Sequence, residues 1–77
     1  MIRFRASGTL MGAVKVEDDG PNGLFIILVD VSHASRSEFV VSSYWDGYES
    51  WNSGRYFDNV RDALEYFSDR VSGAFSS

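Results

Sequence analysis

The chain has 77 residues, of which 44% are hydrophobic and 23% are charged, which is ordinary for one globular domain and excludes a disordered chain. It contains no cysteine, which excludes disulfide scaffolds and thiolate metal sites and suits a reducing compartment. Its formal net charge of −4 makes direct binding to DNA or RNA phosphates unfavourable.

We therefore expect a single domain over residues 1–77, located in the cytoplasm. The longest apolar run, residues 24–29, is far too short to cross a membrane. The first five residues lack the long apolar core of a signal peptide, so we expect them to begin a strand.

Four segments of the first 45 residues have strand patterns. Residues 2–7, 10–17 and 38–45 alternate between two sets of side chains, as half-buried strands do. Residues 24–31 are almost continuously apolar, which indicates a central strand covered on both faces. Turns are predicted at residues 7–9, where Gly8 is free to adopt positive φ, and at residues 18–23.

The next segment is rich in glycine and aromatic residues. Asp46-Gly47 suggests a hairpin turn, and residues 48–51 then return as a short fifth strand. A second turn is predicted at residues 52–55.

A helix follows, because apolar residues recur there every three or four positions. Asp58 or Asn59 can cap its first turn, and Gly73 can end it early. The apolar stripe consists of Val60, Ala63, Leu64, Phe67, Val71, Ala74 and Phe75. The prediction is an α+β domain: an antiparallel four- to five-stranded β-meander with one C-terminal α-helix packed on one face.

One helix covers only one face of such a sheet. The other face still carries Met11, Ala13, Val40 and Tyr44. This apolar surface is either wrapped by residues 44–57 or forms an interface, so the protein is expected to be a monomer or a weak homodimer.

Nothing in the sequence predicts catalysis, a metal ion or a cofactor. The only histidine, His33, lies in a serine-rich loop without the orienting acid and oxyanion donors that a working base requires. Asp18 and Asp19 are adjacent and precede a proline, which does not fit the alternating oxygen ligands of a calcium loop. We expect a protein that is not an enzyme.

Six aromatic rings lie close together in the sequence: Tyr44, Trp45, Tyr48, Trp51, Tyr56 and Phe57. They either fill a small core or anchor a protein interface, where Trp and Tyr are favoured. Their neighbours Asp46 and Glu49 are acidic, which argues against base stacking in a basic groove. Trp45 and Trp51 are the candidate contact residues.

Acidic residues dominate the second half of the chain. Residues 1–36 carry four acids and four bases, whereas residues 37–77 carry seven acids and three arginines. An acidic row recurs every three or four residues along the helix, opposite the apolar stripe, and consists of Asp58, Asp62, Glu65 and Asp69. Arg61 and Arg70 are expected to neutralise it in part.

This row is either a solvated outer face or a strip that docks on Lys and Arg of a partner. A helix rises about 1.5 Å per residue, so the row is sparser than duplex DNA, which carries about one charge per 1.7 Å. A DNA mimic would need Glu38, Asp46 and Glu49 to widen the patch.

In size, charge and layout the chain resembles the small phage-encoded anti-CRISPR proteins, especially inhibitors of type I systems. The resemblance lies in the hairpin-rich first half, the aromatic residues 44–57 and the helical segment 59–67. It implies a non-enzymatic inhibitor, in the host cytoplasm, that binds the DNA-recognition surface of a Cas complex subunit. It includes no motif and assigns no residue.

Two functions are therefore expected. In the first, the acidic surface occupies a basic nucleic-acid-binding site on a protein partner and blocks target DNA binding. In the second, a structural module homodimerises through its uncovered sheet face.

Overall fold

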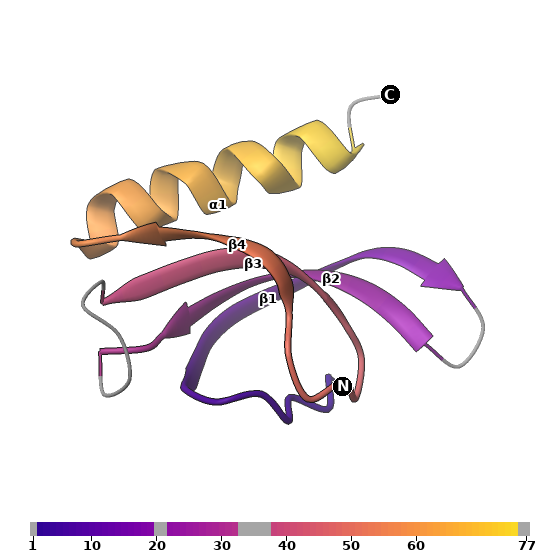
Figure 1. Cartoon of the computed structure of the whole chain (residues 1–77). Coiled ribbons are helices and arrows are strands. Elements are labelled where there is room, and N and C mark those ends of the chain that lie inside the picture. Colours follow the sequence, from indigo (N-terminus) through magenta and orange to yellow (C-terminus); the bar gives the residue numbers. More distant parts are fainter. Residues whose placement is uncertain (1, 20–21, 33–37, 76–77) are drawn as a thin grey trace.

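Four antiparallel strands form one sheet in the order β1-β2-β3-β4. The strands are β1 (Thr9–Asp19), β2 (Asn22–Asp30), β3 (Phe39–Trp45) and β4 (Asn52–Phe57), and the helix α1 (Val60–Phe75) packs on one face (Figure 1). This computed structural model describes residues 2–19, 22–32 and 38–75. It confirms the predicted α+β meander with one C-terminal helix. His33 and the centre of the turn at residues 20–21 lie outside the described residues.

The predicted first strand is wrong. Residues 2–7 form no ladder; they cross the sheet face opposite α1 as an irregular segment, which we call the N-terminal strap (Figure 1). Ile2, Phe4 and Ala6 pack on the sheet, while Arg3 and Arg5 are exposed. The alternating pattern therefore correctly predicted which side chains point inward. It did not show that the backbone pairs with a neighbouring strand.

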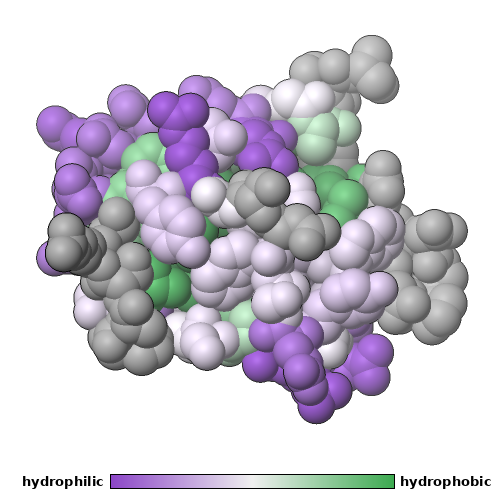
Figure 2. Space-filling model, in the orientation of Figure 1, coloured by the Kyte–Doolittle hydropathy of each residue, from purple (hydrophilic) through white to green (hydrophobic). Residues whose placement is uncertain are grey.

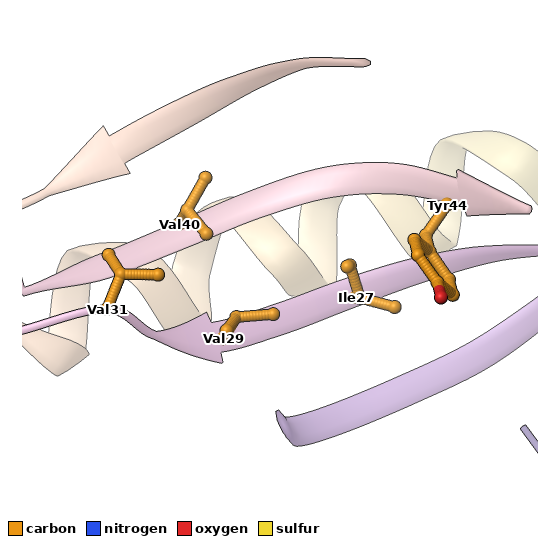
Figure 3. Close-up of a cluster of buried hydrophobic side chains, with 5 residues drawn as sticks. All are labelled: Ile27, Val29, Val31, Val40 and Tyr44. Carbon is orange, nitrogen blue, oxygen red and sulfur yellow. The ribbon is translucent and has the colours of Figure 1, made fainter. Parts of the chain in front are cut away.

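The strap covers the sheet face opposite α1, which the sequence left as either wrapped by residues 44–57 or open as an interface. Five buried side chains project from this face, away from α1: Ile27, Val29, Val31, Val40 and Tyr44 (Figure 3). The strap and Trp51 pack against them, and Phe4 stacks near Trp51 with ring centroids 6.5 Å apart. The face is thus covered, mainly by the strap and only in part by the 44–57 segment.

The face toward α1 has its own core. Ile26, Leu28 and Val41 are buried there beneath Ala63. Six partly buried residues surround them: Val16, Phe39, Phe57, Tyr66, Phe67 and Val71. Strand β2 therefore buries side chains on both faces, as its continuous apolar sequence predicted.

Irregularities in β1 change the expected side-chain alternation. The register with β2 shifts between Leu10 and Gly12 and again between Lys15 and Glu17. Because a bulge adds one residue to one strand, Leu10 packs in the strap-side core while Val16 packs in the helix-side core. The sequence pattern had placed both on one face, which is wrong. Met11, at the first shift, is exposed.

Strand β4 occupies residues that were predicted to be a turn, and residues 48–51 are not a strand. Its register with β3 pairs Phe57 with Phe39 and Arg55 with Val41. Gly54 is essential to this pairing, because a Cβ there would collide with the Val40 side chain and approach Trp51 Nε1 to 3.0 Å. A residue with low strand propensity is thus required by close packing.

Two predicted turns are confirmed. Gly8 has a φ of 110°, and a Cβ there would lie 2.6 Å from Val29 Cγ1, so only glycine fits where the strap turns into β1. At Asp46-Gly47, the amide of Tyr48 donates to the carbonyl of Trp45 over 3.1 Å.

Helix α1 is rotated relative to the expected stripe. Ala63 is fully buried, but Leu64, which belongs to the predicted apolar stripe, is 49% exposed. Tyr66 instead faces the sheet and contacts Phe57 with ring centroids 5.4 Å apart. The helix continues through Gly73, so the predicted early end is wrong.

The orientation of α1 predicts unequal effects of truncating two neighbouring side chains. Phe67→Ala should lower the free energy of unfolding by about 2–4 kcal/mol, because a partly buried ring leaves a cavity. Leu64→Ala should cost less than about 1 kcal/mol, since half of that side chain is already in water. Chemical denaturation of both variants measures the difference, and equal costs would contradict the observed rotation.

Tyr44 connects the strap to the sheet through its hydroxyl. This oxygen accepts from the amide of Arg5 at 3.0 Å and lies within donating distance of the carbonyls of Arg3, at 3.1 Å, and Tyr48. The side chain is only 1% exposed, so water cannot replace these bonds.

Tyr44→Phe should therefore destabilise the fold by about 1–3 kcal/mol, because it leaves polar backbone groups near the strap unsatisfied. The matched control is Tyr56→Phe at an exposed position, expected to change stability by less than about 0.5 kcal/mol. Thermal or urea unfolding of the two variants provides the comparison. A Tyr44→Phe protein as stable as the control would show that the strap does not depend on this hydroxyl.

Candidate protein-binding surface

The outer face of α1 carries the acidic row that the sequence predicted. Asp58, Glu65 and Asp69 are exposed, and in the described part of the chain none of them forms an ion pair. Residues 62, 65 and 69 share one face because they are three and four positions apart. We call Asp58, Asp62, Glu65 and Asp69 the acidic strip.

Asp62 has a structural contact as well. Asn59 is the N-cap of α1: its Oδ1 accepts from the amide of Asp62 at 2.9 Å, and its Nδ2 donates to Asp62 Oδ2 at 3.1 Å. This reciprocal bonding resembles a capping box, and an acid in the first turn is also favoured by the helix dipole. Of the two predicted caps, Asn59 is the one observed.

Arg70 does not neutralise the strip as expected. Its Nη2 donates to Ser43 Oγ on β3 at 2.9 Å, and its guanidinium lies 5.7 Å from the Tyr66 ring centroid. The side chain is thus turned toward the sheet. Arg61 is exposed and is the one base of the helix that remains outside the helix–sheet contact, so the strip is more acidic than the sequence suggested.

The structure does not bring Asp46 and Glu49 into the strip. Both contact the strap, on the side of the sheet opposite α1 (Figure 1). Asp46 accepts from the backbone amide and from Nε of Arg3, and its side chain is only 13% exposed. Glu49 Oε1 forms an ion pair with Nη2 of Arg5 at 3.6 Å. The idea that these two acids widen the helix patch is therefore wrong.

Glu38 is exposed just before β3, where its amide donates to the carbonyl of Phe57 at 3.1 Å. Strand alternation puts it on the same face as Val40, away from α1. The acidic strip therefore contains only the helix residues and Asp58, and it remains sparser than DNA.

The aromatic residues divide between core and surface. Tyr44 is buried, and Trp51 packs on the strap-side core beside Phe4, so Trp51 serves the fold. Trp45 is partly buried at the end of β3, opposite Leu24. Tyr48 and Tyr56 are exposed. Trp45 and Trp51, the two predicted contact residues, are therefore both partly buried, and neither belongs to the acidic strip.

Two sets of residues were missed by sequence reasoning. One is the polar clamp on the strap, formed by Tyr44 and Asp46; the other is the pair Arg55 and Arg70, whose guanidinium groups lie 5.2 and 5.7 Å from the Tyr66 centroid. The first depends on contacts between residues far apart in the sequence, such as Arg3 with Asp46 and Arg5 with Tyr44, which the alternation of Arg3 and Arg5 does not reveal. The second depends on the helix rotation and has no sequence signal.

Comparison with known protein families, with characterised proteins and with solved structures finds no match. In the described residues, no helix is long and apolar enough to cross a membrane.

The clamp on the strap predicts a pH dependence. The hydrogen bond from the Arg3 amide holds the pKa of Asp46 below its ordinary value, so ionised Asp46 stabilises the folded state above about pH 4, the pKa of an unfolded aspartate. This stabilisation is lost as the pH falls through the lower pKa of the folded state.

Asp46→Asn should therefore be less stable than the wild type at neutral pH, and the difference should shrink as the solution is acidified below about pH 4. Thermal melts across the acid range measure it. A constant difference at every pH would show that the charge of Asp46 plays no part. Glu49→Gln, at an exposed ion pair, is the control and should have a small effect throughout.

Proposed function

We propose that the protein is a non-enzymatic inhibitor whose acidic strip binds a basic, nucleic-acid-binding surface of a protein partner. The observation that carries the proposal is the strip itself: exposed carboxylates on the outer face of α1, which the structure leaves without ion pairs in the described residues. Long-range attraction between such a strip and Lys or Arg side chains accelerates association and orients the partner.

The placement of Arg70 supports this function. A helix whose purpose is only to be solvated gains from mixed charges on its surface. Here one of its two arginines bonds to Ser43 on the sheet, and the acids are left with Arg61 alone. The resemblance to type I anti-CRISPR proteins makes the DNA-recognition surface of a Cas complex the first partner to test.

The second expected function, homodimerisation through an uncovered sheet face, is less well supported. The strap and Trp51 pack on that face, and Val40 and Tyr44 are almost completely buried beneath them. A dimer through this face would have to displace the strap and its hydrogen bonds.

The test uses two double variants with the same net charge. Glu65→Lys with Asp69→Lys reverses the charge of two acids in the strip and leaves intact Asp62, which bonds to the Asn59 cap. Glu38→Lys with Glu49→Lys reverses two acids that do not lie on α1. Each double variant removes two negative and adds two positive charges, which brings the net charge from −4 to zero in both, so any difference between them reflects position.

In a competition assay with a purified type I Cas surveillance complex and its labelled target duplex, the wild type should block DNA binding. The helix variant should lose inhibition by about tenfold or more, mainly through slower association, while the control variant should stay close to the wild type. Inhibition should also weaken with salt, because exposed charges are screened beyond about 8–10 Å at physiological ionic strength. Equal inhibition by both folded variants would show that the acidic strip does not contribute to partner binding. No inhibition by the wild type would remove the Cas complex as the partner.

A further inference from the structure

A groove of about 280 Å³ opens between the C-terminal half of α1 and the sheet. Its walls come from β1, β2, β3 and the helix: Val16, Leu24, Ile26, Ser43, Arg70 and Ala74. Figure 2 shows hydrophobic surface on this flank, below the C-terminal end of α1. The groove thus combines an apolar floor with two polar side chains.

The polar end of the groove carries a fixed positive charge. Arg70 donates through Nη2 to Ser43 Oγ at 2.9 Å and through Nη1 to the Tyr66 hydroxyl at 3.4 Å. Stacking on Tyr66 further limits the motion of the guanidinium group. Because a guanidinium has five N–H donors, these two bonds leave donors for a ligand.

Within the described residues, no carboxylate forms an ion pair with this charge. In the described part of the chain, the ion pairs are those of Arg3 and Arg5, and Arg70 has none. A second guanidinium, that of Arg55, lies over the same Tyr66 ring. Two guanidinium groups that form no ion pair within the described residues make this flank locally attractive to an anion.

We infer that the groove binds a small carboxylate with an unbranched apolar tail, its carboxylate on Arg70 and Ser43 and its tail along Val16, Leu24 and Ile26. A planar carboxylate matches the guanidinium fork, and the apolar floor favours a hydrocarbon tail over water. The volume of about 280 Å³ limits the ligand to a small molecule with a short tail.

The size also argues for a small molecule over a polypeptide segment. The volume lies just below the usual range of about 300–1,000 Å³ for ligand pockets, and it is bounded by one turn of α1 between Arg70 and Ala74. This site is separate from the acidic strip, which lies on the outer face of the helix, so its test does not depend on the proposed function.

The probe is sodium octanoate, titrated below its micelle concentration into the isotopically labelled full chain and followed by NMR. The expected result is saturable shifts confined to the methyl groups of Val16, Leu24, Ile26 and Ala74 and to the Nε–H of Arg70. Octan-1-ol, which has the tail without the charge, and octylammonium, which has the opposite charge, should bind at least about tenfold more weakly, since a charge-assisted hydrogen bond is lost.

Two variants locate the carboxylate and the tail. Arg70→Gln should weaken octanoate binding by about tenfold or more, whereas Arg61→Gln, an exposed arginine of the same helix, should leave it unchanged. Ala74→Phe keeps the charge but fills the groove, and it should also weaken binding. The amide spectrum of each variant confirms that it is folded, so that a loss through unfolding is recognised and Ala74→Phe still tests the site.

Several outcomes would overturn the inference. They are the absence of saturable shifts with the wild type, equal affinity for octanoate and octan-1-ol, or unchanged affinity in folded Arg70→Gln. A short peptide ending in leucine, with a free carboxylate, is compared with its amidated form. If the free peptide binds at the same methyl groups more tightly than octanoate, the occupant is a polypeptide terminus and the small-molecule assignment is wrong.

Discussion

The requirement to bury both faces of β2 and β3 determines the rest of this structure. These strands carry large apolar side chains on either side, and a single helix covers only one side of the sheet. In the described residues, the other face is covered by residues 2–6 and by Trp51. The domain is thereby three layers thick, with α1, the sheet and the strap in order (Figure 1). A small domain of this kind buries only about 60% of its unfolded surface, so each layer contributes a large share of its stability.

The strap is an irregular segment and therefore needs polar contacts that a strand would obtain from its neighbour. Its amides and carbonyls bond to the Tyr44 hydroxyl, to the Asp46 carboxylate and to the amide of Gly47. This explains why Asp46 serves folding, whereas Glu65 and Asp69 on α1 form no ion pair in the described residues. The described acids thus differ in role: Asp46 and Glu49 pair with Arg3 and Arg5, whereas Asp58, Glu65 and Asp69 of the acidic strip form no ion pair in the described residues.

The sequence predicted the fold class, the central strand, the turns at Gly8 and Gly47, a cap at Asp58 or Asn59 and the exposed acidic face of α1. It failed wherever the answer depended on contacts between distant residues. The period of two in residues 2–7 is correct for the side chains, but alternation alone does not distinguish a paired strand from an extended segment lying across a sheet. Residues 52–55 look like a turn by composition, yet pairing with a buried strand and the close approach of Trp51 to Gly54 make them part of β4. The bulge at Met11 and the rotation that exposes Leu64 have the same origin, because packing against the sheet overrides local periodicity.

The division between folding and surface residues also bears on the functional assignments. A binding residue can be tested cleanly only if its substitution leaves the fold intact. The acidic strip on the outer face of α1 meets this condition better than Arg70 on the side facing the sheet. Glu65 and Asp69 contact nothing that the fold requires, so the strip can change sign at little cost in stability. Arg70 is different, because its bonds to Ser43 and Tyr66 connect the helix to β3. A guanidinium held by neutral partners contributes to packing and still keeps its charge for a ligand, whereas an ion pair with a carboxylate would have cancelled that charge. The choice of a serine and a tyrosine as its neighbours is therefore what keeps this flank of an acidic protein receptive to an anion.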